Sequence, residues 1–283
     1  MNDPERGGLH LVLRAVGIAA LLVVAYDSVL AKLATDWWQI SDYSYGILVA
    51  GFAFYLAWSR MRSLRSMTLR PSWWGVLLVA AAIVLQILGV YGAELFMSRV
   101  SMVVLLAGIA LGFGGARVLR LFAFPLFVLL IAIPIPALIL SEVTLPLQLI
   151  SSKFATALLQ SSGVPVLRDG NVIQLPAMSL EVAEACSGIR SLMSLMSLAV
   201  FYSYFREKSN LRRGVLVLAS IPIAIVTNAL RIFGTGLCVQ YWTPDAAQGF
   251  FHEFSGWIVF LFSLALLVAF HRLLKLLPRR RVS

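Results

Sequence analysis

Residues 71–93 read PSWWGVLLVAAAIVLQILGVYGA and contain no charged side chain. A helix needs about 17–25 apolar residues to cross the hydrocarbon layer of a bilayer, where a continuous helix satisfies its own backbone hydrogen bonds. This stretch meets that length, and several other windows of the chain do so as well. The sequence therefore predicts an all-α polytopic membrane protein.

The composition of the whole chain agrees with this class. Of its 283 residues, 60% are hydrophobic and 13% are charged, whereas soluble domains average about 45–50% apolar residues. The formal net charge of +10 would suit a polyanionic partner, but the basic residues fall in short clusters between apolar spans. They indicate membrane topology, and no nucleic-acid partner is expected.

The apolar windows predict about eight transmembrane helices within one integral membrane domain, residues 1–283. No cleavage site clearly follows the first window, so it is interpreted as a retained anchor. Pro125, Pro134 and Pro136 in the fifth helix predict that its outer half is kinked or broken. The eight predicted centres are Leu22, Gly51, Ala82, Ala107, Leu130, Met196, Ile223 and Phe262.

The orientation follows from the loops that carry basic residues. Most of the 23 Lys and Arg residues lie before the first span, in three alternate loops and after the last span. The positive-inside rule makes these segments, and both termini, cytoplasmic. The basic residues are Arg6, Arg14, Arg60, Arg62, Arg65, Arg70, Arg117, Arg120, Arg206, Lys208, Arg212, Arg213, Arg272, Lys275, Arg279, Arg280 and Arg281. Acidic residues mark the opposite, external loops: Asp36, Asp42, Glu94, Glu142, Asp169, Glu181, Glu184, Asp245 and Glu253.

The longest external segment is the loop predicted over residues 141–185. A moderately apolar stretch at residues 145–159 favours a helix that lies along the membrane interface. Two β-type runs, residues 164–167 and 172–175, flank Asp169-Gly170, which predicts a small β-hairpin. Such a hairpin could bind an extended peptide at its edge, or it could be a structural cap over the helices.

Cys186 follows this segment in the sequence ACSGIRS, residues 185–191. Since the chain enters the sixth helix from outside, Cys186 is expected at a helix N-terminus, where unpaired N–H groups and the dipole favour a thiolate. Arg190 adds positive charge one turn later. A free cysteine is usually a small buried apolar residue, but this position, with Ser187 and Gly188 next, favours a nucleophile.

Two further residues are expected near the same membrane surface. Asn228 and Arg231 lie three residues apart near the outer end of the seventh helix, hence on one helical face. Arg231 could simply extend toward the lipid headgroups, or it could stabilise negative charge on a carbonyl under attack. His252, at the external start of the eighth helix, could be an interfacial residue or could move a proton to a leaving amine. Residues 186–256 are therefore the predicted catalytic region.

These residues resemble the three signature blocks of the exosortases: Ala-Cys-Ser-Gly-Ile-Arg-Ser, then Asn228-Ala-Leu-Arg231, then His252 with Gly256. The resemblance covers mainly residues 163–256. It implies a cysteine transpeptidase or protease with Cys186 as nucleophile, Arg231 as stabiliser of the acyl-transfer intermediate and His252 as general acid and base. It also implies a multi-pass protein of the bacterial inner membrane, with a periplasmic active site and an association with exopolysaccharide loci.

The same resemblance implies the substrate, a protein whose C-terminal tail has a Pro-Glu-Pro-like motif, one transmembrane helix and a basic cluster. The acceptor of the acyl group is left open between water and an amine or hydroxyl of a lipid or glycan. Arg190 could share or replace the role of Arg231. Cys186 and Cys238 show no zinc-ligand spacing, so neither a metal nor a cofactor is expected.

Two other classes of function compete with the enzyme. In a transporter or lipid-linked sugar flippase, Asp27, Arg99, Arg190 and Arg231 would line a substrate path. A scaffold of a polysaccharide export complex would need none of the three catalytic candidates individually. Loss of turnover in a Cys186→Ala variant separates the enzyme from both.

Overall fold

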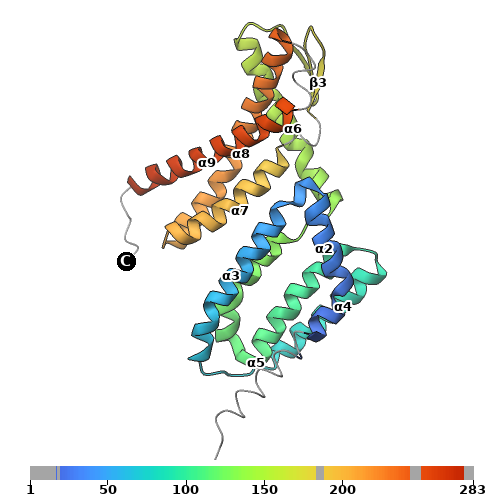
Figure 1. Ribbon diagram of the computed structural model, residues 1–283, viewed down its shortest axis with the longest axis vertical. Coiled ribbons are helices and arrows are strands. Elements are labelled where there is room, and N and C mark those ends of the chain that lie inside the picture. The colour runs from blue at the N-terminus through green and yellow to red at the C-terminus, as the bar shows by residue number, and fades with distance from the viewer. Residues whose placement is uncertain (1–16, 18–19, 183–187, 243–249, 277–283) are drawn as a thin grey trace, which may run out of the picture. The chain divides into compact units, whose positions relative to one another are not determined.

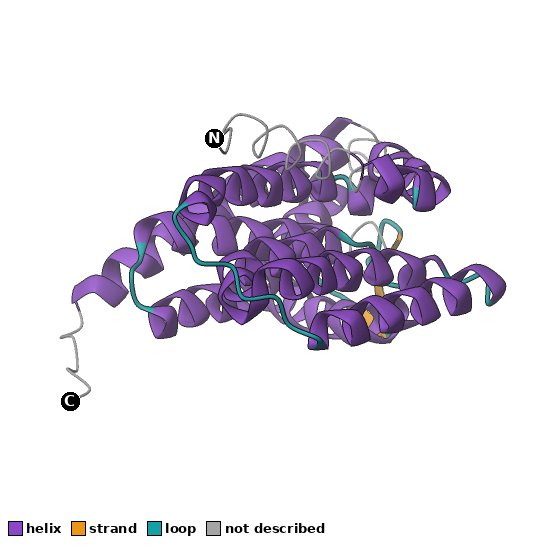
Figure 2. Ribbon diagram, turned by 90° about the horizontal axis from the view of Figure 1, so that it is seen from below, coloured by secondary structure: helices purple, strands orange, loops and turns teal. Residues whose placement is uncertain are grey.

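The computed structural model describes residues 17, 20–182, 188–242 and 250–276, without the side chains of Arg65 and of residues 250–255. The chain divides into two compact units, residues 1–134 and residues 135–283, and each is described by itself below. Helices make up nearly all of the described chain, and the strands occupy one small region (Figure 1, Figure 2). This agrees with the predicted all-α class.

Unit 1 is built from helices that meet through a tight bend and two short connections. The bend lies between α2 and α3 and measures 105°. It passes through the short 3-10 helix η1, where the chain leaves the α-helical path. The elements are α2 (Asp27–Gln39), η1 (Ser41–Tyr43), α3 (Tyr45–Arg65), α4 (Trp74–Tyr91) and α5 (Leu95–Ala132).

The α5 helix turns back on itself at Gly115, whose φ of 77° and ψ of −175° are not helical. The Trp37 indole donates a hydrogen bond to the Ala132 carbonyl at 2.9 Å, while the neighbouring Asp36 pairs with Arg99. In a straight helix, Arg99 and Ala132 would lie about 50 Å apart at about 1.5 Å per residue. The two parts of α5 must therefore run in opposite directions, as the separate fourth and fifth spans predicted (Figure 1).

A glycine is required at this reversal for two reasons. Its positive φ is a conformation that residues with a Cβ rarely adopt. In addition, a Cβ at Gly115 would lie 2.0 Å from the Arg70 carbonyl oxygen, because the α3–α4 connection packs against the turn. The Arg70 N–H also donates to the Gly114 carbonyl at 3.3 Å. Two basic segments that the sequence assigns to the cytoplasm thus lie together in unit 1.

A buried ion pair stands near the opposite end of these helices. Asp36 is 6% exposed and Arg99 3% exposed, and Lys32 approaches the same carboxylate at 3.3 Å. The interaction of Arg99 with a carboxylate explains how a guanidinium is tolerated inside an apolar unit, since buried charges are normally paired. Arg99 therefore holds α5 to α2, and this leaves it unsuited to the open substrate path of a transporter.

Unit 2 combines four helices with a three-stranded sheet. Its apolar side chains form two clusters, which we name the bundle core and the head core. The bundle core joins α7 to the first half of α8, with contributions from α6 and α9. The head core joins the second half of α6, the sheet and the end of α8. The elements are α6 (Ala137–Ser161), β1 (Leu167–Asp169), β2 (Val172–Gln174), β3 (Ser179–Glu181), α7 (Ile189–Arg206), α8 (Asn210–Tyr241) and α9 (Phe250–Leu276).

The α6 helix buries polar side chains and exposes apolar ones. This pattern is the reverse of an amphipathic helix in a soluble protein, and it is typical of a helix whose inner face packs through small polar residues within a membrane. The predicted helix at residues 145–159 is confirmed, but it begins earlier, at Ala137, so residues 141–161 are not a loop. The buried set is Thr144, Gln148, Ser151, Ser152 and Thr156, and the exposed set includes Leu138, Val143, Leu145, Ile150 and Phe154.

The predicted hairpin is confirmed, with a third strand added to it. β1 pairs antiparallel with β2, with Asp169 opposite Val172. The two-residue turn between them begins at Gly170, which has a φ of 61°, as hairpin turns with glycine at the first turn position require. β2 then pairs antiparallel with β3. The sequence analysis did not predict β3, because Ser179, Leu180 and Glu181 form too short a run for an alternating pattern of apolar and polar residues to be recognised.

The described helices differ in whether they are long and apolar enough to cross a membrane. By length and apolar composition, four helical segments of the described chain could each cross a membrane: α4, α5, α8 and residues 256–276 of α9. The bent pair of α2 and α3 raises this number to five. All eight predicted centres lie in helices, and the reversal of α5 accounts for two of them. The total of eight, the single membrane domain and the cytoplasmic termini stay predictions.

We expect topology reporters fused at Ser66 and Ser209 to register as cytoplasmic, and those at Asp169 and Asp245 as external. The reason is the separation of basic and acidic loops along the chain. Alkaline phosphatase and fluorescent-protein fusions would measure the side of each position. A cytoplasmic signal at Asp169 would contradict an external catalytic face, because residue 186 follows the same segment.

A cluster of polar side chains joins the C-terminal end of α7 to α9, at the end of unit 2 that carries its basic residues. The Tyr202 hydroxyl and His271 Nδ1 are hydrogen-bonded at 2.8 Å, and His271 Nε2 lies 3.4 Å from a Glu207 carboxylate oxygen. The Lys208 N–H donates to the other carboxylate oxygen at 3.0 Å. Burial raises the pKa of the Glu207 carboxyl, but these hydrogen bonds and the charge of Arg212 outweigh it and hold the pKa below its ordinary value.

A lowered pKa in the folded state makes Glu207 a source of stability above pH 4.5, its ordinary value, and this stability declines as the pH falls further. We expect Glu207→Gln to lose about 1–3 kcal/mol at pH 7, since it removes a charged hydrogen-bond acceptor. The variant should also be less sensitive to acid than the wild type. Thermal unfolding between pH 3 and pH 7 measures both effects, and Glu142→Gln, on the exposed face of α6, is the control.

Candidate active site

A buried polar layer separates the bundle core from the head core in unit 2. Asn228 is 2% exposed, and its amide Nδ2 lies 3.3 Å from the hydroxyl of Ser151 on α6. Along α8, Asn228 stands between Ala224 of the bundle core and Ile232 of the head core. A buried amide is costly unless it is hydrogen-bonded, so this contact fixes the two helices at one register.

The start of α7 packs directly against this layer. Gly188 is the residue before the helix and has a left-handed conformation with a φ of 80°. A Cβ at this position would lie 2.8 Å from the side-chain carbon Cγ of Asn228. Glycine is therefore needed both for the backbone conformation and for the close approach. The residue that immediately precedes α7 is therefore packed on Asn228.

Arg231 connects the same layer to α9. A Cβ at Gly256 would lie 3.8 Å from a guanidinium nitrogen of Arg231, so this half-buried arginine lies against α9. His252 precedes Gly256 by four residues on the same helix, and positions four apart share one face. The helix thus brings position 252 to the face that meets Arg231.

The described structure does not extend to every predicted site residue. Cys186 and Ser187 lie outside the described residues, and so does the side chain of His252. The helix that Cys186 was expected to open begins at Ile189. Arg190 is exposed, whereas Arg231 is half-buried.

The convergence of the three motif regions on one layer agrees with a family comparison. Residues 37–269 match the family model of the transmembrane exosortases. The chain is a member of the exosortase family. No curated protein and no solved structure matches the chain. The exosortase match also covers α3, α4 and α5, where the sequence resemblance rested on apolar character alone.

Sequence reasoning missed two polar residues that support the exosortase site. Ser151 bonds Asn228, and the neighbouring Ser152 donates its hydroxyl to the Gly170 carbonyl at 3.2 Å. The second contact ties the hairpin turn to the polar layer. The polar residues Thr144, Gln148, Ser151, Ser152 and Thr156 recur at helical spacing in an otherwise apolar stretch, a weak signal that marks one face of α6 without showing that it is buried or what it contacts.

We expect Gly188→Ala to destabilise the exosortase by at least about 1 kcal/mol, because a left-handed conformation costs a residue with a Cβ about that much or more. The added methyl group would also displace Asn228, so substrate processing should fall. Gly214→Ala, at an open position of α8, is the matched control and should be stable and active. Thermal unfolding and a processing assay test both, and wild-type behaviour of Gly188→Ala would contradict the close approach of α7 to Asn228.

Proposed function

We propose that this exosortase is a cysteine transpeptidase or protease that cleaves C-terminal sorting tails at the outer face of the bacterial inner membrane. The observation that carries the proposal is the meeting of the three motif regions at the Asn228 layer. Gly188 packs on Asn228, and Arg231 lies against Gly256. Of the two remaining motif residues, Cys186 precedes Gly188 by two positions and His252 precedes Gly256 by four. Two residues of extended chain span at most about 7 Å, which supports a place for Cys186 near this layer.

In the proposed reaction the Cys186 thiolate attacks the carbonyl carbon of the scissile peptide bond. A carbon–sulfur bond forms, the carbonyl oxygen becomes negatively charged, and collapse of this intermediate expels the amine of the downstream fragment. His252 donates the proton that the leaving amine needs. Water, or an amine or hydroxyl of a lipid or glycan, then attacks the carbonyl carbon of the resulting thioester, and His252 accepts the proton of that nucleophile. The carbon–sulfur bond breaks, which releases the acyl product and restores the Cys186 thiolate and the protonated His252.

Arg231 is the proposed stabiliser of the charged intermediate. A guanidinium placed before the reaction begins stabilises a developing oxyanion most effectively in a site that excludes water. The half-burial of Arg231 against α9 supports this role, because a planar guanidinium held in place has less freedom to lose. Arg190, which is exposed, is the weaker candidate.

The scissile peptide bond of the substrate must lie at the same depth in the membrane as the catalytic residues, and the proposed substrate meets this depth requirement. Arg231 lies where the two cores of unit 2 meet. Beyond it, α8 continues to Tyr241 and contributes Ile232 and Val239 to the head core. With the predicted topology, this layer lies at the outer boundary of the bilayer. A tail with one membrane helix and a basic cluster that stays inside would hold the segment before the helix at that boundary.

The test is to co-express the exosortase with a tagged protein that ends in a Pro-Glu-Pro-like motif, one membrane helix and a basic cluster. Mass spectrometry of both fragments locates the cut, which we expect on the external side, next to the substrate's helix. A cytoplasmic cut would contradict the proposed face. Equal processing after deletion of the substrate helix would contradict the depth requirement.

A further inference from the structure

The hydrogen bonds of the sheet define which backbone groups of β3 point away from it. The Val182 N–H donates to the Asn171 carbonyl at 3.0 Å, and the Leu175 N–H donates to the Met178 carbonyl at 3.1 Å. In an antiparallel pair, alternate residues direct both of their backbone groups to the same neighbour. Met178, Leu180 and Val182 therefore bond to β2, and the residues between them face outward.

These outward residues are Ser179 and Glu181, each with one N–H and one carbonyl at the edge of the sheet. Within the part of the chain that the structure describes, no backbone group bonds to these four edge groups. Their side chains are exposed, while Leu180 between them packs on the head core. A row of unpaired groups at strand spacing is a template for another extended chain.

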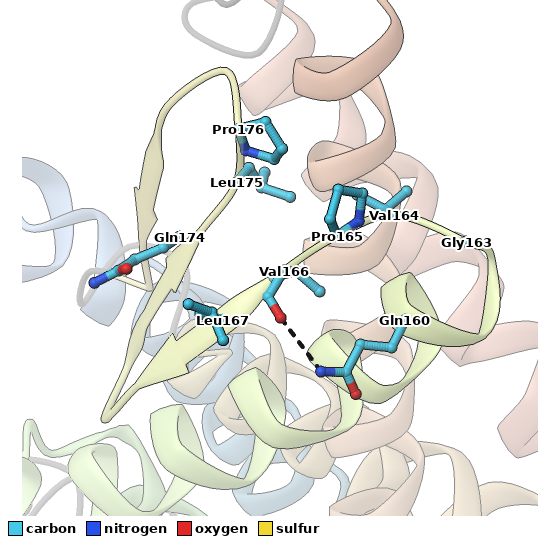
Figure 3. A pocket seen from close by; sticks show the side chains of 9 residues that line it. All are labelled: Gln160, Gly163, Val164, Pro165, Val166, Leu167, Gln174, Leu175 and Pro176. Carbon is cyan, nitrogen blue, oxygen red and sulfur yellow. Dashed lines mark hydrogen bonds between the residues drawn. The ribbon is translucent and has the colours of Figure 1, made fainter.

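The other edge of the sheet is occupied in a different way. By the same alternation, Val166 and Arg168 point outward from β1, since Leu167 and Asp169 pair with β2. Gln160, near the end of α6, donates its amide to the Val166 carbonyl at 3.3 Å (Figure 3). The α6 helix thus covers part of this edge, so β1 is less open to a peptide than β3.

The sheet also has one end near the polar layer and one end away from it. The Gly170 turn contacts Ser152, next to the Ser151 that bonds Asn228, and Val182 pairs at this end. At the far end, an open groove of about 810 Å³ is lined by Gln160, Val166, Pro176 and neighbouring residues (Figure 3). Ser152 and Gln160 are separated by about 12 Å along α6, so the groove is the end distant from the site.

We infer that the free edge of β3 binds the extended segment of the substrate by strand addition, an inference that rests on the proposed function. β3 runs toward the polar layer, and Cys186 follows Glu181 by five residues in the sequence. A peptide that bonds to Ser179 and Glu181 would be directed along the edge toward the nucleophile. Strand addition gives affinity through the main chain and selects side chains at alternate positions.

The experiment removes one edge donor without breaking the sheet. Ser179→Pro deletes an N–H that points away from β2, at the first residue of an edge strand, where proline is tolerated. We expect its KM for the membrane-anchored substrate to rise about tenfold, as the loss of one hydrogen bond implies, with kcat little changed. Arg168→Pro is the matched control at the other edge. It is the harsher change, since it also removes the 2.7 Å hydrogen bond from Arg168 to the Gly170 carbonyl, yet KM should stay near the wild-type value.

A second measurement does not depend on how proline is tolerated. A photo-crosslinking amino acid at Ser179, in a Cys186→Ala background, should capture the tagged substrate, whereas the same group at Arg168 should not. Capture at Arg168 with none at Ser179, or an unchanged KM in Ser179→Pro, would overturn the assignment to β3 and leave the proposed cleavage intact. Continued cleavage by Cys186→Ala would instead overturn the proposed function, while capture at Ser179 would still report on binding.

Discussion

Cys186→Ala is expected to reduce processing of the membrane-anchored substrate by at least about 10³-fold, because removal of a covalent nucleophile typically costs more than this. In the proposed reaction, the thiolate forms the only covalent bond between the substrate and the protein, and alanine has no group that can replace it. The position just before α7 favours this chemistry, since the positive end of a helix dipole and a nearby cation lower a thiol pKa. Immunoblots of the tagged substrate measure the loss.

Cys238→Ser is the matched control for this experiment. Cys238 is half-buried within α8, beyond Arg231, and no step of the proposed reaction uses it. The variant should keep its activity, and a membrane-impermeant thiol reagent should inactivate it by modification of Cys186. If Cys186→Ala still processes the substrate, covalent catalysis is wrong, and the transporter or scaffold hypothesis would gain support.

The secondary structure of the helices was largely predictable from local sequence. Uncharged runs gave the centres of the spans, and every predicted centre lies in a helix. The reversal at Gly115 was implied by Arg117 and Arg120, because basic residues between two apolar runs indicate a loop. The local sequence could not show how that loop closes, since Gly115 is needed both for its positive φ and because the Arg70 carbonyl lies against it.

The α6 helix shows where the sequence was misleading. Lys153 and Gln160 interrupt its apolar stretch, which favoured a shorter helix at the interface. In the structure, α6 is longer than predicted. It buries Thr144, Ser151, Ser152 and Thr156 and exposes Leu138, Leu145 and Leu149. Which face is buried depends on partners distant in the sequence, such as Asn228, and no local pattern contains that information.

The candidate site was predicted as a set of positions, and the structure supplies some of the contacts between them. Gly188 and Asn228 were each identified from motifs, but their direct contact depends on the left-handed turn before α7. Ser151 was not identified, because a single serine in an apolar helix resembles many others. The bonds that unite the site join residues far apart in the chain, and these are the least predictable from sequence.

Arg231→Lys is expected to lower kcat by about 10²–10³-fold, the usual cost of losing one oxyanion-stabilising group, with a smaller effect on KM. A lysine keeps the charge but replaces a planar guanidinium by a compact ammonium that cannot donate two parallel hydrogen bonds. Arg231 is held against Gly256 on the face of α9 that carries position 252. Arg190→Lys is the matched control, because it makes the same chemical change at an exposed position of α7, and its kcat should change little.

Both variants would be assayed on the membrane-anchored substrate beside His252→Ala, which we expect to be inactive. An inactive Arg190→Lys together with a nearly normal Arg231→Lys would transfer the stabilising role from α8 to α7, where the cation would act from the same helix that Cys186 precedes.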